Sequence, residues 1–347
     1  MEVMMSQTIA LPITESSQTS AARRTALALA TSLGFDATER ERVAIVATEM
    51  AQNLVKFATH GELLLQPLSR DKTTGLELLA LDRGPGMRDL TECLQDGFST
   101  VGTSGNGLGA INRLSTFFDW YSLPQVGTAL LSQFWPKPLL GQQLAGLECS
   151  AVCLPMAGEE SSGDAWAVEH RLGRSLFLVV DGLGHGLAAA QAATAAVKLF
   201  HEQTDLSPKA FLEAAHPVLR STRGAAIAVA EVDLQERVVR FAGVGNIAGT
   251  ILSPHKNCGL VSHHGTVGYE MHRVQEFVYP WPAGALLVMH SDGLTARWQL
   301  ERYVGLVARH PSLVAGVLYR DFSRGRDDVA VLVARAMANE ELAPWNL

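Results

Sequence analysis

Aspartates that stand next to apolar runs are the most informative residues in the second half of this chain. In chain order they are Asp164, Asp181 followed by Gly182, Asp292 followed by Gly293, and the adjacent pair Asp327 and Asp328. A buried strand delivers the residue just past its end to a fixed position, and a glycine there lets the backbone turn and expose its carbonyl. Oxygen ligands of this kind suit Mg²⁺ or Mn²⁺ rather than a thiolate-binding metal. The pattern therefore predicts a hydrolytic site that uses divalent metal ions.

A second group of polar and glycine residues, in the first half, could bind a nucleotide. It comprises Glu49 and Asn53 on one predicted helix face, Asp82, Gly84 and Gly86 after a predicted strand, and Gly105, Gly107 and Gly109 at the start of another predicted helix. A glycine-rich loop that runs into a helix N-terminus offers backbone N–H groups and the positive end of the helix dipole to phosphates. Asn53 can hold a phosphate-bound Mg²⁺ through oxygen, and Asp82 can accept a hydrogen bond from an adenine amino group. The glycine segment alone also fits a plain surface loop, so the signal lies in the combination.

The element that must position Glu49 and Asn53 is a predicted amphipathic helix. Thr38, followed three residues later by Glu41, has the pattern of a capping box, which predicts that the helix begins there. Apolar residues at steps of three and four form the expected buried stripe: Val43, Val46, Met50, Leu54 and Phe57. Polar residues recur at similar steps on another face: Glu49, Asn53, Lys56 and His60. Polar side chains aligned in this way can address one ligand.

The remaining predicted elements indicate two domains. Strands near 8–13, 61–67, 76–81 and 128–135, with helices near 21–33 and 108–117, indicate an α/β layer in a domain at 1–136. Residues 137–146 have the Pro and Gly content of a linker, and a second domain follows at 147–338. Its strands cluster in blocks, near 148–154, 165–170, 175–180, 225–232, 237–243, 247–252, 285–290 and 328–334. With helices near 187–201, 208–220 and 301–309, this favours packed antiparallel sheets with helices outside.

Composition and charge disfavour several classes of protein. The chain has 347 residues, 47% of them apolar, which is enough for two cores. A net charge of −7, with no run of five or six like charges, argues against a nucleic-acid partner. No uncharged apolar stretch reaches the roughly 18 residues of a membrane span, and the N-terminus lacks the basic region of an export signal. We therefore expect a cytoplasmic protein with no membrane partner.

The motifs of the first half together resemble the ATP-binding motifs of the GHKL superfamily, in particular its RsbT-like serine kinases and RsbW-like anti-sigma factors. The resemblance covers about residues 8–135 and includes the later Gly127-Thr128. It implies a Bergerat-type α/β sandwich that binds ATP with Mg²⁺. It also implies the following roles: Mg²⁺ ligand for Asn53, adenine binding for Asp82, contact near the base for Thr128, and nucleotide-enclosing loops for Gly84, Gly86, Gly105, Gly107 and Gly109.

The same resemblance makes Glu49 the general base for a serine hydroxyl. A carboxylate one helical turn before the Mg²⁺-binding Asn53 would lie near the γ-phosphate, where it can accept the proton of the attacking hydroxyl. Glu49 could instead pair with a neighbour such as Lys56. The domain would then bind ATP without transferring phosphate.

The aspartate series of the second half resembles the metal-dependent type 2C protein phosphatases, in their SpoIIE-like and RsbX-like branch. The resemblance covers about residues 147–336 and implies an α/β/β/α sandwich with two Mg²⁺ or Mn²⁺ ions. It makes Asp181 the carboxylate that bridges the two ions, with the Gly182 carbonyl on one of them. Asp164, Asp292 and Asp327 would complete the set of ligands directly or through water, while Asp328 stays an alternative to Asp327. Such ions activate water and stabilise charge on phosphate oxygens, so the expected chemistry is phosphoester hydrolysis without a phosphoenzyme.

Three further features of the second half are left open by the sequence. His185 could be an acid for the leaving group or a structural residue near a helix start. Asn246 fits a plain Gly-Asn turn better than a site residue. No arginine can be assigned as the phosphate-binding group, and the candidates are Arg223, Arg297 and Arg326, for each of which surface solvation is the default.

Together the two resemblances predict a bifunctional bacterial signalling regulator. Its phosphatase half would act on a phosphoserine or phosphothreonine of a STAS-type anti-sigma antagonist or stressosome protein, and its N-terminal half would be a serine-kinase-like ATP-binding domain. In the alternative, the N-terminal half is a non-catalytic module that binds ATP, a sigma factor or a STAS partner. A general small-molecule phosphohydrolase is a third, weaker option.

Overall fold

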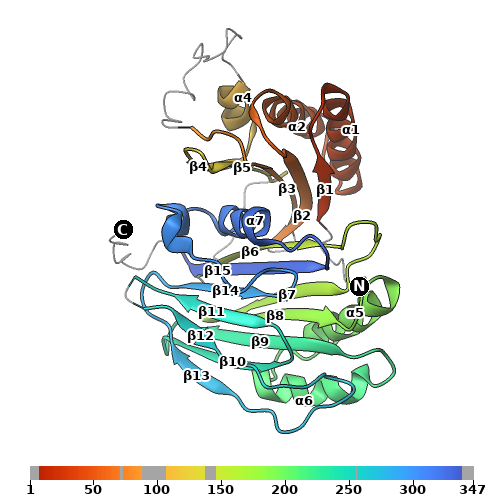
Figure 1. Ribbon diagram of the computed structural model, residues 1–347, viewed down its shortest axis with the longest axis vertical. Helices are drawn as coiled ribbons and strands as arrows, with labels where there is room; N and C mark the ends of the chain where they lie inside the picture. The colour runs from red at the N-terminus through yellow and green to blue at the C-terminus, as the bar shows by residue number, and fades with distance from the viewer. Residues whose placement is uncertain (1–7, 71–72, 88–106, 137–145, 255, 338–347) are drawn as a thin grey trace. The chain divides into compact units, whose positions relative to one another are not determined.

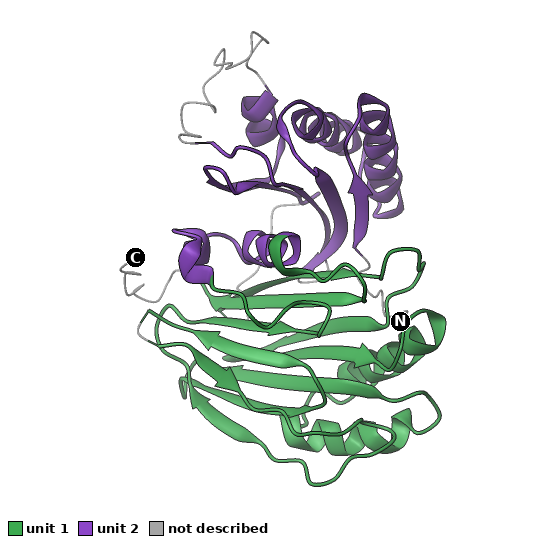
Figure 2. Cartoon of the chain, viewed as in Figure 1, with its two compact units in different colours: residues 1–5, 142–299, 321–347 green, residues 6–141, 300–320 purple. Residues whose placement is uncertain are grey.

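A computed structural model describes residues 8–70, 73–87, 107–136, 146–254 and 256–337 of the chain (Figure 1). The chain divides into two compact units (Figure 2). Unit 1 comprises residues 1–5, 142–299 and 321–347, and unit 2 comprises residues 6–141 and 300–320. Residues 300–320 thus belong to the unit of the N-terminal half, although they lie in the sequence between two of the phosphatase-like motifs.

Unit 2 is built on a five-stranded antiparallel sheet. Its strands lie in the order β1 (Ile9–Pro12), β2 (Glu62–Arg70), β3 (Thr73–Asp82), β5 (Gly127–Phe134) and β4 (Phe117–Leu123). One face packs against helices α1 (Ser16–Ser32), α2 (Ala37–Phe57) and α4 (Gly107–Leu114). Alternate residues of β3, namely Leu76, Leu78 and Ala80, point into this core because side chains alternate along a strand.

Helix α2 carries the buried stripe that its periodicity predicts. Val43, Val46, Met50 and Leu54 are all buried, whereas Phe57 at the end of the helix is 44% exposed. The predicted start was wrong by two residues. Asp36 caps the helix by accepting a hydrogen bond of 2.8 Å from the backbone N–H of Glu39, whose side chain reaches back to complete the capping box.

The second face of the sheet in unit 2 carries helix α7 (Pro311–Phe322), which the sequence analysis did not identify. The helix predicted near 301–309 was wrong. That stretch holds two short 3₁₀ turns, Leu300–Arg302 and Leu306–Ala308, and Gly305 between them adopts a left-handed conformation with φ of 80° that interrupts an α-helix. Pro311 starts α7 at the first helical position, where its missing N–H costs no hydrogen bond.

Unit 1 contains two further five-stranded antiparallel sheets. The first has the order β13 (Phe277–Pro280), β10 (Val238–Val244), β9 (Ala225–Asp233), β8 (Arg174–Gly182) and β7 (Asp164–Arg171). The second has the order β12 (Cys258–Leu260), β11 (Ala248–Leu252), β14 (Leu286–His290), β15 (Val329–Ala336) and β6 (Leu147–Leu154). Helices α5 (Leu187–Glu202) and α6 (Pro208–Leu219) cover the outer face of the first sheet.

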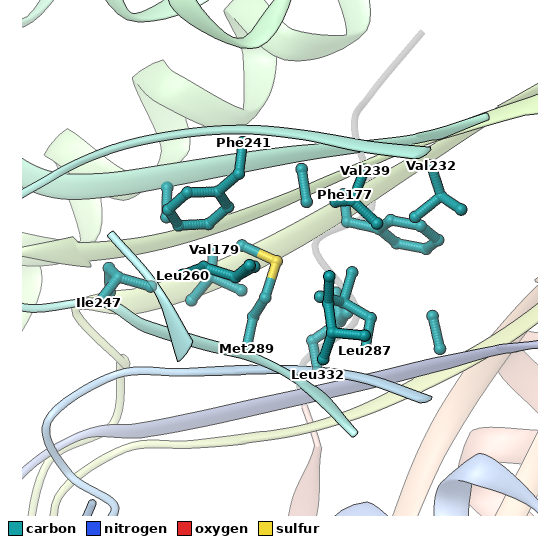
Figure 3. Packing of buried hydrophobic residues seen from close by; sticks show 14 of the residues in the cluster. Phe177, Val179, Val232, Val239, Phe241, Ile247, Leu260, Leu287, Met289 and Leu332 are labelled. Carbon is teal, nitrogen blue, oxygen red and sulfur yellow. The ribbon is translucent and has the colours of Figure 1, made fainter. Parts of the chain in front are cut away.

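The main core of unit 1 lies between these two sheets. Figure 3 shows Phe177, Val179 and Phe241 from one sheet facing Leu287, Met289 and Leu332 from the other. Each large apolar side chain buried in this way contributes on the order of 2 kcal/mol through the hydrophobic effect. The alternate residues of β8, Leu176, Leu178 and Val180, point the other way into the core beneath α5 and α6.

Both architectures agree with the mixed α/β classes expected from the sequence: a sheet covered by helices in unit 2, and two facing sheets with helices on an outer face in unit 1. Among the described residues, no helix combines the length and the apolarity needed to cross a membrane.

Candidate functional site

The acidic residues of unit 1 gather because strand alternation directs them to one end of the sandwich. On β8, Asp181 falls on the same face as Phe177 and Val179, which point between the sheets. Asp164 at the start of β7 pairs directly with Asp181 in the strand register. In the opposite sheet, Asp328 precedes β15 and Asp292 follows β14 by two residues. The core between the sheets therefore ends in carboxylates.

Asn246 joins the two sheets at this end. Its side-chain N–H group donates to Oδ2 of Asp181 at 3.0 Å and to Oδ2 of Asp292 at 2.9 Å. A single amide nitrogen that reaches both carboxylates fixes their closest oxygens within a few ångströms of each other. Asn246 lies in the bend between β10 and β11, as the turn interpretation expects, but its side chain also contacts two carboxylates of the cluster, which that interpretation did not include.

Asp164 and Asp328 are held by neighbouring donors and are both buried. The hydroxyl of Ser291 donates to Asp164. Asp328 accepts backbone N–H groups on both of its oxygens, from Met156 at 2.7 Å and from Gly163 at 2.7 Å. Asp328 thus connects two loops, while the exposed Asp327 only accepts the N–H of Asp328 at 3.0 Å.

Burial, and after it the crowding of like charges, raises the affinity of these carboxyls for protons. Burial, and after it the charge of Asp292, raises the pKa of Asp181 to about 7. Burial and the charge of Asp181 raise the pKa of Asp164 well above its ordinary range. A divalent cation would relieve this repulsion, and the donors are all oxygens, as Mg²⁺ and Mn²⁺ prefer. Among the described residues, no three acidic, His or Cys side chains converge in a ready-made metal geometry.

Glycines at the cluster are required by close backbone contacts. A Cβ on Gly182 would lie 2.3 Å from the carbonyl oxygen of Ala189, and one on Gly293 would lie 1.9 Å from that of Asp328. Both distances are far below any real carbon–oxygen contact, so a side chain at either position must displace the backbone that carries the aspartates.

Among the three candidate arginines, Arg223 has a defined position beside the cluster. Its Nη1 lies 3.0 Å from where a Cβ of Gly184 would be, next to the loop that follows Asp181. Within the described part of the chain, no hydrogen bond or ion pair holds its guanidinium. Arg223 is exposed, as are Arg297 and Arg326. His185 is also exposed and pairs with Glu159 at 2.7 Å, which gives it a structural partner.

Three of the candidate nucleotide residues of unit 2, Glu49, Asn53 and Gly107, lie close together beside α2. A Cβ on Gly107, the first residue of α4, would lie 2.9 Å from Oε2 of Glu49 and 3.8 Å from Oδ1 of Asn53. Both side chains therefore face the N-terminus of α4. No hydrogen bond or ion pair joins Glu49 to Lys56 or to any other described residue. Gly109 is buried inside α4, and Gly105 lies outside the described residues.

Asp82 and Thr128 stand opposite each other on neighbouring strands β3 and β5. The Asp82 carboxylate accepts the N–H of Gly84 at 2.6 Å. Burial raises the pKa of Asp82, while the N–H of Gly84 and the charge of Arg320 act in the lowering direction. The hydroxyls of Thr128 and Ser122 lie 3.0 Å apart.

The loop after Asp82 is pinned to the turn between β4 and β5. Ser122 accepts the N–H of Met87 at 2.7 Å, and Gln125 donates its N–H to Pro85 at 2.8 Å. Gly86 has φ of 67°, and a Cβ there would lie 2.3 Å from the Leu123 carbonyl oxygen. Ser122 and Arg320 were missed by the sequence analysis because neither belongs to a glycine or aspartate motif.

Family models match both halves of the chain. Residues 13–131 match the histidine kinase-like ATPase domain, and residues 172–337 match stage II sporulation protein E (SpoIIE). The serine/threonine-protein kinase RsbT of Bacillus subtilis (strain 168) is 32% identical over 115 residues, which are 33% of this chain and 86% of RsbT.

Solved structures resemble the second half. One, from work on the bacterial stressosome as a modular system adapted to control secondary messenger signalling, is 31% identical with a TM-score of 0.51 and covers 55% of this chain and 99% of that one. The crystal structure of RsbX in complex with magnesium is 17% identical with a TM-score of 0.50, covering 54% of this chain and 94% of RsbX, and shows a shared fold.

The chain therefore belongs to the family of RsbT-like histidine kinase-like ATPase domains over its N-terminal half, joined to a SpoIIE-type domain of the PP2C fold. This confirms the fusion that the two groups of motifs predict.

Proposed function

We propose that this protein is a bifunctional signalling regulator whose C-terminal half removes phosphate from serine or threonine of a partner protein. The observation that carries the proposal is the single amide of Asn246 that bridges Asp181 and Asp292 from two different sheets. Carboxylates in this arrangement repel one another unless a cation or protons neutralise them. In a hydrolytic site, bound metal ions would neutralise this repulsion and the carboxylates would serve as their ligands.

The metal ligands of the proposed phosphatase site are Asp181, the Gly182 carbonyl, Asp164, Asp292 and Asp327. When bound, Mg²⁺ or Mn²⁺ activates water and stabilises negative charge on phosphate oxygens. The protein's part is to hold the ligands: Ser291 orients Asp164. Asp328 supports the site indirectly, since both of its oxygens already hold backbone N–H groups, which favours Asp327 as the ligand.

Arg223 is the group we assign to the substrate phosphate. Its guanidinium lies beside Gly184 and has no carboxylate partner among the described residues. A guanidinium binds two phosphate oxygens at once, which orients the phosphorus toward the attacking water.

In the N-terminal half we propose ATP binding with Mg²⁺ and phosphate transfer to a serine or threonine. Asn53 would bind the Mg²⁺, Asp82 and Thr128 the adenine, and Gly84, Gly86, Gly105, Gly107 and Gly109 would form the loops around the nucleotide. Glu49 would take the proton of the attacking hydroxyl. Support comes from its position beside Gly107 and from the absence of an ion pair at Glu49 among the described residues.

The proposed partner is a STAS-domain phosphoprotein of an anti-sigma or stressosome system, in the cytoplasm. Similarity to the kinase RsbT and to a structure from stressosome work supports this choice. A kinase and a phosphatase that act on one switch would run in opposite directions, and a phosphoryl group adds nearly two negative charges to the partner.

The phosphatase half is tested with a ³²P-labelled phospho-STAS protein and Mn²⁺. The wild type releases labelled phosphate, and Asp181→Asn reduces the rate at least a hundredfold. Asp205→Asn is the matched control, because Asp205 is an exposed aspartate paired only with Arg171. If Asp181→Asn and Asp205→Asn release phosphate at the same rate, the assignment of the site is wrong.

The kinase half is tested with an unphosphorylated STAS protein, labelled ATP and Mg²⁺. Glu49→Gln should abolish transfer while ATP still binds, and Glu41→Gln on the same helix, an exposed partner of Arg23, should have no effect. ATP binding without transfer by the wild type would select the alternative, a non-catalytic ATP-binding module. Co-purification of a sigma factor with that module would identify it as a partner-binding one.

A further inference from the structure

Residues 300–320 connect the two candidate sites along the chain. They follow the Asp292-Gly293 motif and precede Asp327, yet they are part of unit 2, together with the sheet that carries Asp82 (Figure 2). Helix α7 has its body in unit 2, up to Arg320, and its last residues in unit 1.

At the start of the segment, polar contacts fix it to strands β3 and β4. Arg309 Nη1 donates to Asp119 at 3.1 Å, and the backbone N–H of His310 donates to the same carboxylate at 3.0 Å. The guanidinium of Arg309 also lies 4.6 Å from the centre of the Trp120 ring. At the second residue of α7, the Ser312 hydroxyl donates to the buried Glu77 at 2.7 Å.

In the middle of α7, the contact is apolar and very close. A Cβ on Gly316 would lie 2.6 Å from Leu79 and 3.1 Å from Leu81, both on the sheet face opposite α1 and α2. Without a side chain at Gly316, the helix backbone packs directly on these leucines, and a Cβ there would force the Leu79 side chain to shift. The segment is therefore docked along β3, from Glu77 to the strand's end at Asp82.

At that end, Arg320 reaches the backbone of both residues assigned to the adenine. Its Nη1 donates to the carbonyl oxygen of Asp82 at 2.8 Å and to that of Thr128 at 3.4 Å, and Arg320 is only 8% exposed. Gly127 makes room: it has φ of 138°, and a Cβ there would lie 2.0 Å from the Asp82 carbonyl and 2.8 Å from the Arg320 Nη1. Arg83 returns the contact by donating to the Arg320 carbonyl, which satisfies one of the free carbonyls at the end of α7.

Beyond Arg320, the end of α7 is tied to the loop that follows Asp292. The N–H of Thr295 donates to the Phe322 carbonyl at 3.0 Å, and the N–H of Arg324 donates to the Gly293 carbonyl at 2.9 Å. Three residues after Arg324 the chain reaches Asp327. The residues that follow Arg320 thus hold one metal-site loop and lead into the other.

We propose that Arg320 is a positioning residue of the nucleotide site and that, through α7, nucleotide binding changes the rate of the phosphatase. The inference rests on the proposed ATP site and the proposed phosphatase site. It adds a residue of the C-terminal half to the nucleotide site and a route by which each site biases the other.

A helix docked along a strand by hydrogen bonds and close apolar contacts moves with that strand. Adenine bound to Asp82 and Thr128 would favour one position of the strand ends that carry them. Arg320 would move with these strand ends, because two hydrogen bonds join it to their carbonyl oxygens. The helix end then carries the shift to the loops of Asp292 and Asp327. Coupling of this kind is reciprocal, because a free energy that links two sites acts on both.

The first experiment measures binding of a fluorescent non-hydrolysable ATP analogue and of its GTP counterpart to the full-length chain. Arg320→Met should weaken ATP-analogue binding about tenfold and reduce discrimination against the GTP analogue. Arg320→Lys, which keeps one charged donor, should restore part of the discrimination. Arg309→Met is the matched control, since it loosens the same segment without touching Asp82 or Thr128, and should discriminate like the wild type. Equal discrimination in Arg320→Met and wild type would overturn the positioning role.

The second experiment measures hydrolysis of p-nitrophenyl phosphate with Mn²⁺, with and without the ATP analogue. In the wild type and in Arg309→Met, the rate with the analogue should differ from the rate without it by about threefold or more. In Arg320→Met the two rates should be equal. Thermal unfolding of each variant checks that it folds. If the wild type binds the analogue and hydrolyses the ester at a rate that the analogue does not change, the coupling is refuted and the proposed function stands. If the wild type binds no ATP analogue, the ATP half of the proposed function and this inference both fail.

Discussion

The buried carboxylate of Glu77 gives a direct measure of how firmly α7 belongs to the N-terminal domain. Glu77 is 1% exposed and accepts three hydrogen bonds, from Gln66 at 2.8 Å, Gln133 at 2.8 Å and Ser312 at 2.7 Å. The two glutamines come from neighbouring strands of the same sheet, whereas Ser312 comes from α7. Of the three hydrogen bonds to Glu77, the change Ser312→Ala removes the one made by the helix.

The expected loss of stability depends on the hydrogen bonds that Glu77 keeps. A hydrogen bond to a charged acceptor contributes about 1.5–3 kcal/mol, and loss of one partner also leaves a buried acceptor less satisfied. Because Glu77 retains two donors, we expect a loss at the lower end, about 1–2 kcal/mol. For a unit of roughly 150 residues this lowers the midpoint of thermal unfolding by about 2–8 °C.

Scanning calorimetry on the full chain is the assay, with an ATP analogue added to mark the transition of the unit that binds it. Ser312→Ala should lower that transition, and Ser221→Ala, at an exposed serine of unit 1, should leave both transitions in place. The pair Ser312→Ala and Glu77→Ala should be non-additive, since the two residues share one contact. A shift below about 0.5 kcal/mol, the level of an ordinary surface change, would refute the role of Ser312.

Three other predictions follow from single sites. Gly107→Val should reduce ATP affinity at least tenfold in a titration, because even a Cβ there would lie 2.9 Å from Oε2 of Glu49; unchanged affinity would remove Gly107 from the nucleotide site. Burial raises the pKa of Asp82. As the solution is acidified, its carboxylate therefore takes up a proton, and stops accepting a hydrogen bond, at a higher pH than an ordinary aspartate does. ATP affinity should fall in that range and Asp82→Asn should flatten the profile, whereas the same profile in both proteins would exclude Asp82 as the titrating group. Cys149 is partly buried, and desolvation of its sulfur, together with the charge of Glu148, raises its pKa to about 12. Site-resolved mass spectrometry should therefore find its alkylation on the order of a thousandfold slower than that of a free cysteine, and rapid labelling would contradict the raised pKa.

The sequence predicted the features that depend on local pattern. Val43, Val46, Met50 and Leu54 are spaced as a helix requires, and all four are buried. The apolar run that ends at Asp181 is a strand with that residue at its end. Side chains along this strand point alternately into two apolar cores, so a charged residue fits only at the end of the strand.

The sequence could not predict features that depend on distant contacts. Nothing near Asn246 indicates that its amide bridges two aspartates, one of them 65 residues earlier and the other 46 residues later in the chain. Helix α7 is apolar around most of its circumference and therefore lacks the amphipathic period that identifies a surface helix. The start of α2 was displaced because Asp36–Glu39 and Thr38–Glu41 are both capping-box patterns, and Asp36 caps the helix.

Unit 2 is assembled from two stretches of chain separated by most of unit 1, and this limits how such proteins can be recombined. A crossover between residues 137 and 146 would exchange the N-terminal stretch of unit 2 but leave residues 300–320 in place. These residues would then face a sheet that did not evolve with them. Ser312, Gly316 and Arg320 would then meet a sheet without the counterparts of Glu77, Leu79 and Asp82. The two halves are therefore expected to be inherited as a pair, with changes in the sheet accompanied by changes in α7.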